Sequence, residues 1–138
     1  GDVAISLSQF LPRSETIVVT TPQPTAGRVA VKAGLMAEKV NQDVLGVVEN
    51  MSWFTGEDGK RYTIFGEGGG AALAEHLKTD LLVQVPLEPT VRDGADRGLP
   101  AVAVDPDGDA TAAFDRLAQE VENRKPQMRT HPELIVNN

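Results

Sequence analysis

Three short apolar runs, each followed by a proline or a polar turn segment, constrain the fold of this chain more than any other feature. They occupy residues 16–21, 44–48 and 81–85 and consist mostly of valine, isoleucine, leucine and threonine. Such nearly continuous runs are typical of strands that are covered on both faces. Apolar residues with helical spacing fill residues 25–40 and 71–78. Because strands and helices alternate, we predict an α/β fold: a three-layer, mostly parallel sheet with helices on both faces.

Two further helices are predicted near the ends of the chain. Residues 3–11 have helical spacing, and Asp2 is placed as a first-turn anion or cap. A last amphipathic helix covers residues 110–121 and is capped by Asp107 or Asp109. The chain begins with glycine rather than methionine, directly before a helix. We therefore expect it to be the C-terminal part of a longer protein.

The connections between these elements carry weaker signals. Thr25 is placed to cap the helix that follows it. A small hairpin is predicted within residues 60–65, one or two helical turns over residues 90–97 closed by Gly98, and a short extended piece at residues 101–104.

One domain followed by a tail is the predicted organisation. The length of 138 residues lies within the range of about 100–200 residues that is usual for a single domain. After residue 124 the sequence has no periodicity. We therefore expect a domain at residues 1–124 and a mobile tail at residues 125–138.

The balance of charges limits the partners of this chain. Thirteen Lys and Arg residues against 20 Asp and Glu residues give a net charge of −7, and the cations are not clustered. Nucleic acids and anionic membranes need clustered cations, so we expect no nucleic-acid partner and no membrane partner. The apolar runs are far shorter than the ~18–20 residues that span a bilayer, and no signal segment opens the chain. We expect a cytoplasmic protein.

Residues that could hold a metal or act as a nucleophile are scarce. The chain has no cysteine, so it offers neither a zinc thiolate site nor the usual ligands of an iron–sulfur cluster. Its two histidines, His76 and His131, are far apart in sequence and lack ligand spacing. No serine lies in a nucleophile-elbow pattern. The sequence predicts no metal site and no catalytic residue.

Candidate binding residues follow the three predicted strands, because ligands in open α/β sheets bind at the carboxyl ends of the strands. The three segments are residues 20–23, 49–52 and 86–89. Asn50 offers an amide donor and an acceptor that could read a purine edge. Alternatively, it is a turn residue that satisfies loop amides. Two prolines of the third segment could wall a flat ring or simply end a strand.

A glycine-rich run, Gly66-Glu67-Gly68-Gly69-Gly70, precedes the predicted helix at residues 71–78. It lacks the Lys-Ser/Thr of a phosphate-binding P-loop and follows a loop rather than a strand. We interpret it as a flexible or close-packing turn.

Five segments, taken in order, resemble a known family. They read GDVAISL, VVTTPQP, GVVENMS, IFGEGGG and VPLEPTVRDG. Together they resemble the C-terminal half of the Mrp/ApbC ATPases, which are iron–sulfur cluster carriers of the MinD-like P-loop class. The resemblance covers residues 1–122 and implies the C-terminal part of a P-loop NTPase fold.

The resemblance implies a nucleotide site whose phosphate-binding loop and catalytic residues lie upstream of this chain. Asn50 would face the adenine base, and Pro86, Leu87, Glu88 and Pro89 would border the nucleotide. Thr21 and Pro22 would lie at the nucleotide-side end of their strand, and Gly1 and Asp2 would close the switch segment. The parent protein would bind ATP and Mg and hydrolyse ATP as a homodimer, and it would deliver clusters to iron–sulfur apo-protein clients.

One motif of the family is absent. The family often has Cys-Pro-x-Cys shortly after Asn-Met-Ser, whereas residues 55–60 read TGEDGK. A cluster held by the usual ligands is therefore doubtful for these residues. The alternatives are a MinD/ParA-like partitioning or scaffold protein that uses nucleotide as a switch, and a generic Rossmann-type binding module.

Overall fold

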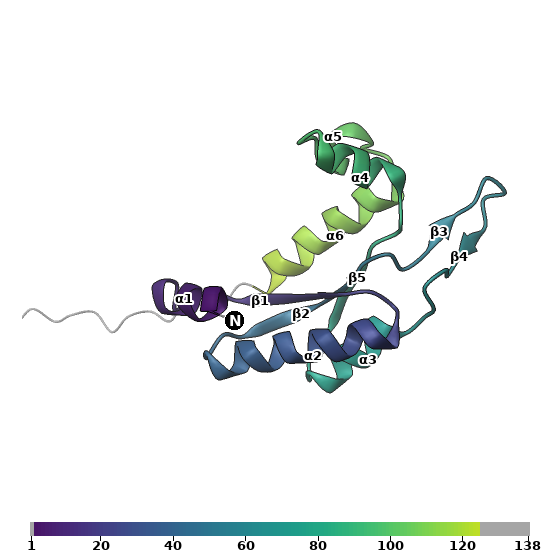
Figure 1. Cartoon of the computed structure of the whole chain (residues 1–138). Coiled ribbons are helices and arrows are strands. Elements are labelled where there is room, and N and C mark those ends of the chain that lie inside the picture. Colours follow the sequence, from purple (N-terminus) through teal and green to yellow (C-terminus); the bar gives the residue numbers. More distant parts are fainter. Residues whose placement is uncertain (1, 125–138) are drawn as a thin grey trace, which may run out of the picture.

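A three-stranded parallel sheet forms the centre of the protein, and the computed structural model describes residues 2–124 of the chain. The strands are β1 (Thr16–Thr20), β2 (Val44–Glu49) and β5 (Leu81–Gln84), in the order β1-β2-β5. All three carboxyl ends therefore lie at one edge of the sheet, as predicted (Figure 1). Gly1 and the predicted tail at residues 125–138 lie outside the described residues.

Helices cover the two faces of the sheet, which confirms the three-layer α/β fold (Figure 1). On one face lie α2 (Pro24–Lys39) and α3 (Gly69–His76), and on the other lies α6 (Asp109–Asn123). The first core cluster joins Val18 and Val47 to Ala30, Leu73, Ala74 and Leu77. The second joins Val48, Val83 and Val85 to Ala113 and Leu117. Each large aliphatic side chain buried in this way stabilises the fold by about 1.5–3 kcal/mol.

The expectation that the first strand is covered on both faces is wrong for one of its faces. Val18 is buried against α2 and α3, but Val19, which points the other way, is 60% exposed. The physical reason is the position of α6, which packs over β5 and leaves β1 as the edge strand of the described sheet.

The predicted first helix is confirmed as α1 (Asp2–Phe10), with Asp2 in its first turn. None of its residues is buried, and Val3 and Phe10 are 74% and 82% exposed. In Figure 1 it lies beyond the amino end of β1, at the edge of the sheet opposite to the carboxyl ends of the strands.

The predicted hairpin exists but begins earlier in the chain. Two short antiparallel strands, β3 (Phe54–Thr55) and β4 (Arg61–Tyr62), form it, and Gly59 supplies a positive φ of 73° in its turn. The Tyr62 hydroxyl donates to the Asp58 carboxylate at 2.6 Å. This hydrogen bond, followed by that from the Lys60 N–H, lowers the pKa of Asp58, and the same carboxylate raises the pKa of Tyr62.

Of two smaller predicted elements, the one at residues 90–97 is confirmed and the one at residues 101–104 is wrong. The turns at 90–97 are confirmed as α4 (Pro89–Asp96), and Gly98 follows it with φ of 69°. Residues 101–104, expected to be extended, form the single helical turn α5 (Ala101–Val104). Pro100 lies at its N-cap, and the N–H groups of Ala103 and Val104 donate to the Pro100 carbonyl.

The predicted helix caps are wrong. The N-cap of α2 is Gln23 rather than Thr25, and that of α6 is Gly108 rather than Asp107 or Asp109, with no side-chain cap hydrogen bond at either helix. Pro24 begins α2, where its missing N–H costs nothing. In α6 the N–H of Ala110 instead donates to the carboxylate of Glu88, at 3.2 Å.

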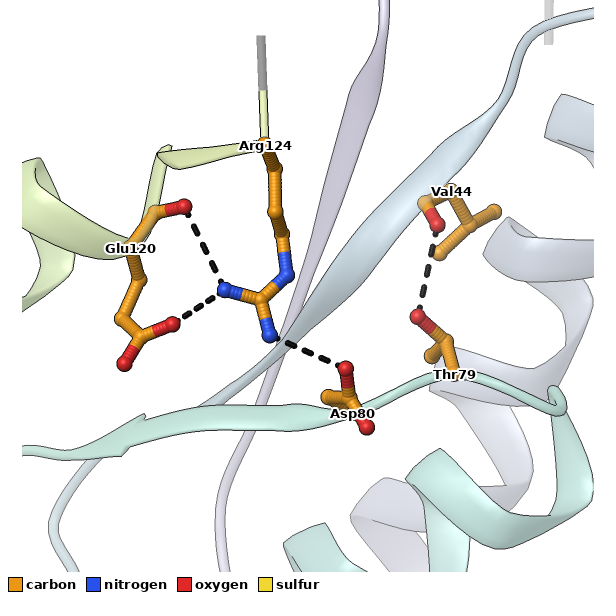
Figure 2. A network of polar contacts seen from close by, with 5 residues as sticks. All are labelled: Val44, Thr79, Asp80, Glu120 and Arg124. Atoms are coloured by element: carbon orange, nitrogen blue, oxygen red, sulfur yellow. Dashed lines mark hydrogen bonds and ion pairs between the residues drawn. The ribbon is translucent and has the colours of Figure 1, made fainter. Parts of the chain in front are cut away.

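Arg124 fastens the end of α6 to the amino end of β5 (Figure 2). Its guanidinium donates to Asp80 at 2.9 Å and also to the Glu120 carboxylate and main-chain oxygen. The two carboxylates, Asp80 first, raise the pKa of Arg124. At the same edge the Thr79 hydroxyl donates to the Val44 carbonyl at 3.3 Å.

Candidate functional site

The loops that follow the three strands are joined by backbone hydrogen bonds that continue beyond the sheet. The Asn50 N–H donates to the Thr20 carbonyl at 2.7 Å, and the Val85 N–H donates to the Glu49 carbonyl at 2.8 Å. The Ser52 N–H then donates to Val85 at 3.0 Å. The segments expected to bind a ligand therefore emerge side by side at the carboxyl edge, with the loop of β2 in the middle.

Asn50 has one amide atom occupied and one available. Its Oδ1 accepts the N–H of Met51 at 2.9 Å, and Met51 has φ of 57°, so the residue stabilises a tight turn. Its amide nitrogen makes no hydrogen bond to another described residue, and the side chain is half-buried. The turn role and the ligand role are therefore compatible, because the donor remains free to meet an acceptor on a ligand.

Thr21 and Pro22 differ in their access to a ligand. Thr21 is half-buried, and its hydroxyl donates to the Gln23 side-chain carbonyl. Pro22 is fully buried against the start of α3. A Cβ on Gly69 would lie 2.3 Å from the Pro22 carbonyl oxygen, so only glycine permits this contact. Pro22 thus packs the helix, and Thr21 is the more accessible of the two.

The third segment combines accessible and structural residues. Pro86 is buried, Leu87 is half-buried and Pro89 is exposed at the first position of α4. The carboxylate of Glu88 accepts the Ala110 N–H at 3.2 Å and the Thr90 hydroxyl at 3.4 Å. Glu88 therefore connects α4 to the start of α6, and Leu87 and Pro89 are the apolar residues of this segment that keep some exposure.

The structure does not bring Asp2 to this edge. Asp2 begins α1, which lies by the amino end of β1 in Figure 1. Gly1 lies outside the described residues.

Sequence reasoning included Glu49 in the candidate segment 49–52 but missed its role in holding the loops together. Its side chain is 1% exposed. Oε1 accepts the Ser52 hydroxyl and the Gln84 amide, each at 2.8 Å, and Oε2 accepts the Gly70 N–H at 2.5 Å. The signal was available: an acidic residue that ends a buried strand must find donors, because burying a carboxylate without them is costly.

The same network explains two glycines of the Gly66–Gly70 run. A Cβ on Gly70 would lie 2.7 Å from the Glu49 Cβ, and Gly69 is equally tight against Pro22. Gly66 and Gly68 have φ of 90° and 80°, which favours glycine for a different reason. The close-packing interpretation is confirmed.

Two cavities lie beside this edge, and Pro22 is among the residues that line the first. One of about 410 Å³ lies between the starts of α2 and α3, with Gln23, Arg28 and His76 in its lining. A second of about 290 Å³ lies between β5, α6 and the hairpin, where the Arg61 guanidinium lies 4.2 Å from the centre of the Trp53 ring.

Residues 2–124 contain neither a cluster of metal ligands nor a membrane-crossing helix. No group of three or more His, Cys, Asp or Glu residues is placed to hold a metal ion in this part of the chain. Among the helices of the same residues, none has the length and apolarity that a membrane crossing requires.

Comparison with known proteins identifies the family. The model of the ParA family described as NUBPL iron-transfer P-loop NTPase matches residues 1–122. The chain belongs to this family. The iron–sulfur cluster carrier protein of Mycobacterium tuberculosis is 42% identical over 131 residues, covering 91% of this chain and 34% of that protein. The resemblance inferred from the ordered motifs is confirmed.

Solved structures similar to this member of the NUBPL family include two nucleotide complexes. A nucleotide-binding protein of Archaeoglobus fulgidus in complex with ADP has a TM-score of 0.64 and 30% identity, covering 83% of this chain and 46% of that one. The septum site-determining protein MinD of Pyrococcus horikoshii, complexed with Mg-ADP, has a TM-score of 0.64 and 27% identity, covering 78% and 41%. The chain spans about a third of the length of the first curated relatives it matches.

Proposed function

We propose that this chain supplies the base-recognition edge and part of the sheet of an ATP-binding iron–sulfur cluster carrier. The observation that carries the proposal is the position of Asn50: it lies in the β2 loop between the loops of β1 and β5, and its amide nitrogen has no hydrogen-bond partner among the described residues. Membership of the iron-transfer P-loop NTPase family and the carrier relatives support it.

Asn50 would hold the base rather than the phosphates. Its amide nitrogen donates to an acceptor on the base edge, and Leu87 and Pro89 offer apolar surface to a flat ring. A base that presents a donor where adenine presents an acceptor would leave this N–H unpaired. That penalty is the physical source of the expected preference for ATP over GTP.

The residues present fit a base but not the phosphate groups or Mg. The start of α3 is a glycine-rich helix N-terminus near this edge, and its Gly70 N–H already donates to the buried Glu49 carboxylate. A phosphate there would lie next to that negative charge, and the Gly70 N–H would not be free to bind it. We therefore assign phosphate and Mg binding, and ATP hydrolysis, to a P-loop that these 138 residues do not contain.

The iron–sulfur cargo would be handled without thiolates from this chain, which has no cysteine. At the hairpin turn, where the family often has cysteines, Asp58 is instead hydrogen-bonded to Tyr62. We propose that the protein acts as a homodimer in the cytoplasm with apo-protein clients, as a carrier of this family would. The MinD-like structures also fit a partitioning switch, but the carrier relatives are more similar in sequence.

The experiment is Asn50→Ala in the full-length protein, with Asn123→Ala at the far end of α6 as the matched control. Losing one or two base hydrogen bonds, worth roughly 0.5–1.5 kcal/mol each, should weaken ATP binding by about 3–30-fold. The ratio of ATP to GTP affinity should fall as well. Calorimetric titration with ATP and with GTP measures the two affinities. If neither the ATP affinity nor the ATP/GTP ratio changed in the Asn50 variant, Asn50 would have only a structural role in its turn.

A further inference from the structure

Both ends of the hairpin segment, residues 53–69, converge on a single carboxylate. Ser52 directly precedes the segment and donates its hydroxyl to Glu49 Oε1, at 2.8 Å. Gly70 directly follows it and donates its N–H to Glu49 Oε2, at 2.5 Å. The chain therefore leaves the sheet, forms the β3–β4 hairpin and returns to the same side chain.

A carboxylate suits this position because it accepts hydrogen bonds and donates none. The Gln84 amide supplies the third donor at 2.8 Å, so strands β2 and β5, the Ser52 loop and α3 are all tied to one group. The start of α3 adds the positive end of its helix dipole. The charge is thus stabilised by donors rather than by a paired cation, and the group is 1% exposed.

Asn50 lies inside the loop that this carboxylate closes. Glu49 precedes Asn50, and Ser52 follows it by two residues, so the Glu49–Ser52 hydrogen bond spans the turn that carries Asn50. The turn has a left-handed Met51 with φ of 57°, a conformation that needs external support. The Asn50 Oδ1 to Met51 N–H hydrogen bond at 2.9 Å gives part of that support from within.

We propose that Glu49 is a positioning residue: its carboxylate clamps the two ends of the hairpin segment and holds the turn that presents Asn50 to the nucleotide base. The clamp couples the hairpin to the base-recognition edge through one buried group. Its nucleotide part rests on the proposed function, whereas its hairpin part does not.

Two substitutions of Glu49 separate connectivity from charge. E49A removes both side-chain acceptors and leaves the Ser52 hydroxyl only the Glu49 main-chain carbonyl, at 2.9 Å. E49Q can keep all three connections, because the new amide oxygen can accept from Gly70 while its nitrogen donates to the Ser52 hydroxyl and to a flipped Gln84 amide. A clamp should therefore be lost in E49A and largely retained in E49Q.

A milder pair guards against misfolding of E49A. Ser52→Ala removes one arm of the clamp, and Thr79→Ala removes one side-chain hydroxyl hydrogen bond, to Val44, at the opposite edge of the sheet (Figure 2). Both variants lose a hydroxyl hydrogen bond, and Thr79→Ala loses a methyl group as well. Faster exchange of residues 53–69 in Ser52→Ala than in Thr79→Ala would therefore reflect the position of the lost hydrogen bond rather than a general loss of stability.

The experiment uses the full-length protein and two readouts. Hydrogen exchange with mass spectrometry should show the peptides of residues 53–69 exchanging about tenfold faster or more in E49A, and faster in Ser52→Ala than in Thr79→Ala. ATP affinity should fall by about 3–30-fold in E49A, as for Asn50→Ala, and stay within about threefold of wild type in E49Q.

Three outcomes decide the proposal. Unchanged exchange of residues 53–69 in a folded E49A, or in Ser52→Ala if E49A does not fold, would overturn it. E49Q as impaired as E49A would also overturn it, because charge rather than connectivity would then matter. Faster hairpin exchange together with ATP affinity that neither E49A nor Asn50→Ala changes would support the clamp and refute the proposed nucleotide site.

Discussion

Gly70→Ala is the most informative single substitution for the packing of this edge, and Gly27→Ala is its matched control. Both glycines lie in the first turns of helices that cover the same face of the sheet, and neither has a positive φ. A Cβ at Gly27 would meet nothing within 4 Å, whereas one at Gly70 would lie 2.7 Å from the Glu49 Cβ and 2.8 Å from its Oε2. The two substitutions therefore differ in contact but not in backbone strain.

The cost at Gly70 has two sources. Forcing an extra methyl into a packed site costs about 1–3 kcal/mol. Displacing Glu49 also weakens the Gly70 N–H hydrogen bond to its carboxylate, and hydrogen bonds to charged groups contribute about 1.5–3 kcal/mol. The two costs overlap, because one shift of Glu49 relieves the clash and breaks the bond. Alanine regains about 0.5–1 kcal/mol of helix preference, which leaves a net loss of about 2–4 kcal/mol.

Urea unfolding of the full-length protein measures the difference. The free energy of unfolding should fall by about 2–4 kcal/mol in Gly70→Ala, which lowers the midpoint by about 1 M urea or more. In Gly27→Ala it should rise by about 0.4–1 kcal/mol, because alanine reduces the entropy of the unfolded chain. Equal effects of the two substitutions would refute the close approach of α3 to Glu49.

Three further predictions test other parts of the molecule. The Asp58–Tyr62 hydrogen bond should order the hairpin most between about pH 4 and pH 10. The pKa of Asp58 is lowered, so this hydrogen bond is lost as the pH falls through the pKa of Asp58. The pKa of Tyr62 is raised, so the hydrogen bond is also lost as the pH rises through the pKa of Tyr62. An NMR titration of the Asp58 carboxyl should give a higher pKa in Tyr62→Phe, and an unchanged pKa would contradict the assignment. In urea unfolding of the 138-residue chain, Val47→Ala should cost about 1.5–3 kcal/mol because Val47 is fully buried. Val19→Ala should change stability by less than about 0.5 kcal/mol because Val19 is exposed. Arg124→Ala should cost only about 0.2–1 kcal/mol, since its partner Asp80 is largely exposed, and a double-mutant cycle with Asp80→Asn that gives more than about 2 kcal/mol would contradict this.

The fold was predictable because its signals are local. A short apolar run such as residues 44–48 buries its side chains well as a strand in the interior of a sheet. When such strands alternate with helices, few chain topologies are possible. The exposure of Val19 was not predictable, since it depends on where α6 packs, some ninety residues away in sequence. The caps failed for a related reason: the Ala110 N–H is satisfied by Glu88, a residue that sequence spacing cannot pair with α6.

The candidate site was predictable in place but not in detail. The position of Asn50 follows from the rule that strand ends meet at one edge, and the backbone hydrogen bonds around it confirm that the loops meet. Which residues of the third segment, 86–89, support the fold and which stay exposed could not be predicted from the sequence. Pro86 is buried and Glu88 accepts a hydrogen bond from the start of α6, whereas Leu87 is half-buried and Pro89 is exposed, and this depends on the turn into α4.

A glycine-rich run before a helix can either bind a phosphate or pack against a carboxylate of the same protein. Only the group that contacts the run shows which of the two roles it has. A helix N-terminus with glycines offers N–H groups to any anion, and a phosphate and a buried carboxylate are equivalent in that respect. Here the anion is Glu49, which the protein supplies from its own strand, and Gly70 binds it at 2.5 Å. Because the Gly70 N–H is already occupied by this carboxylate, we interpret the run as a turn that stabilises the edge, and the Asn50 amide nitrogen is a donor without a partner among the described residues.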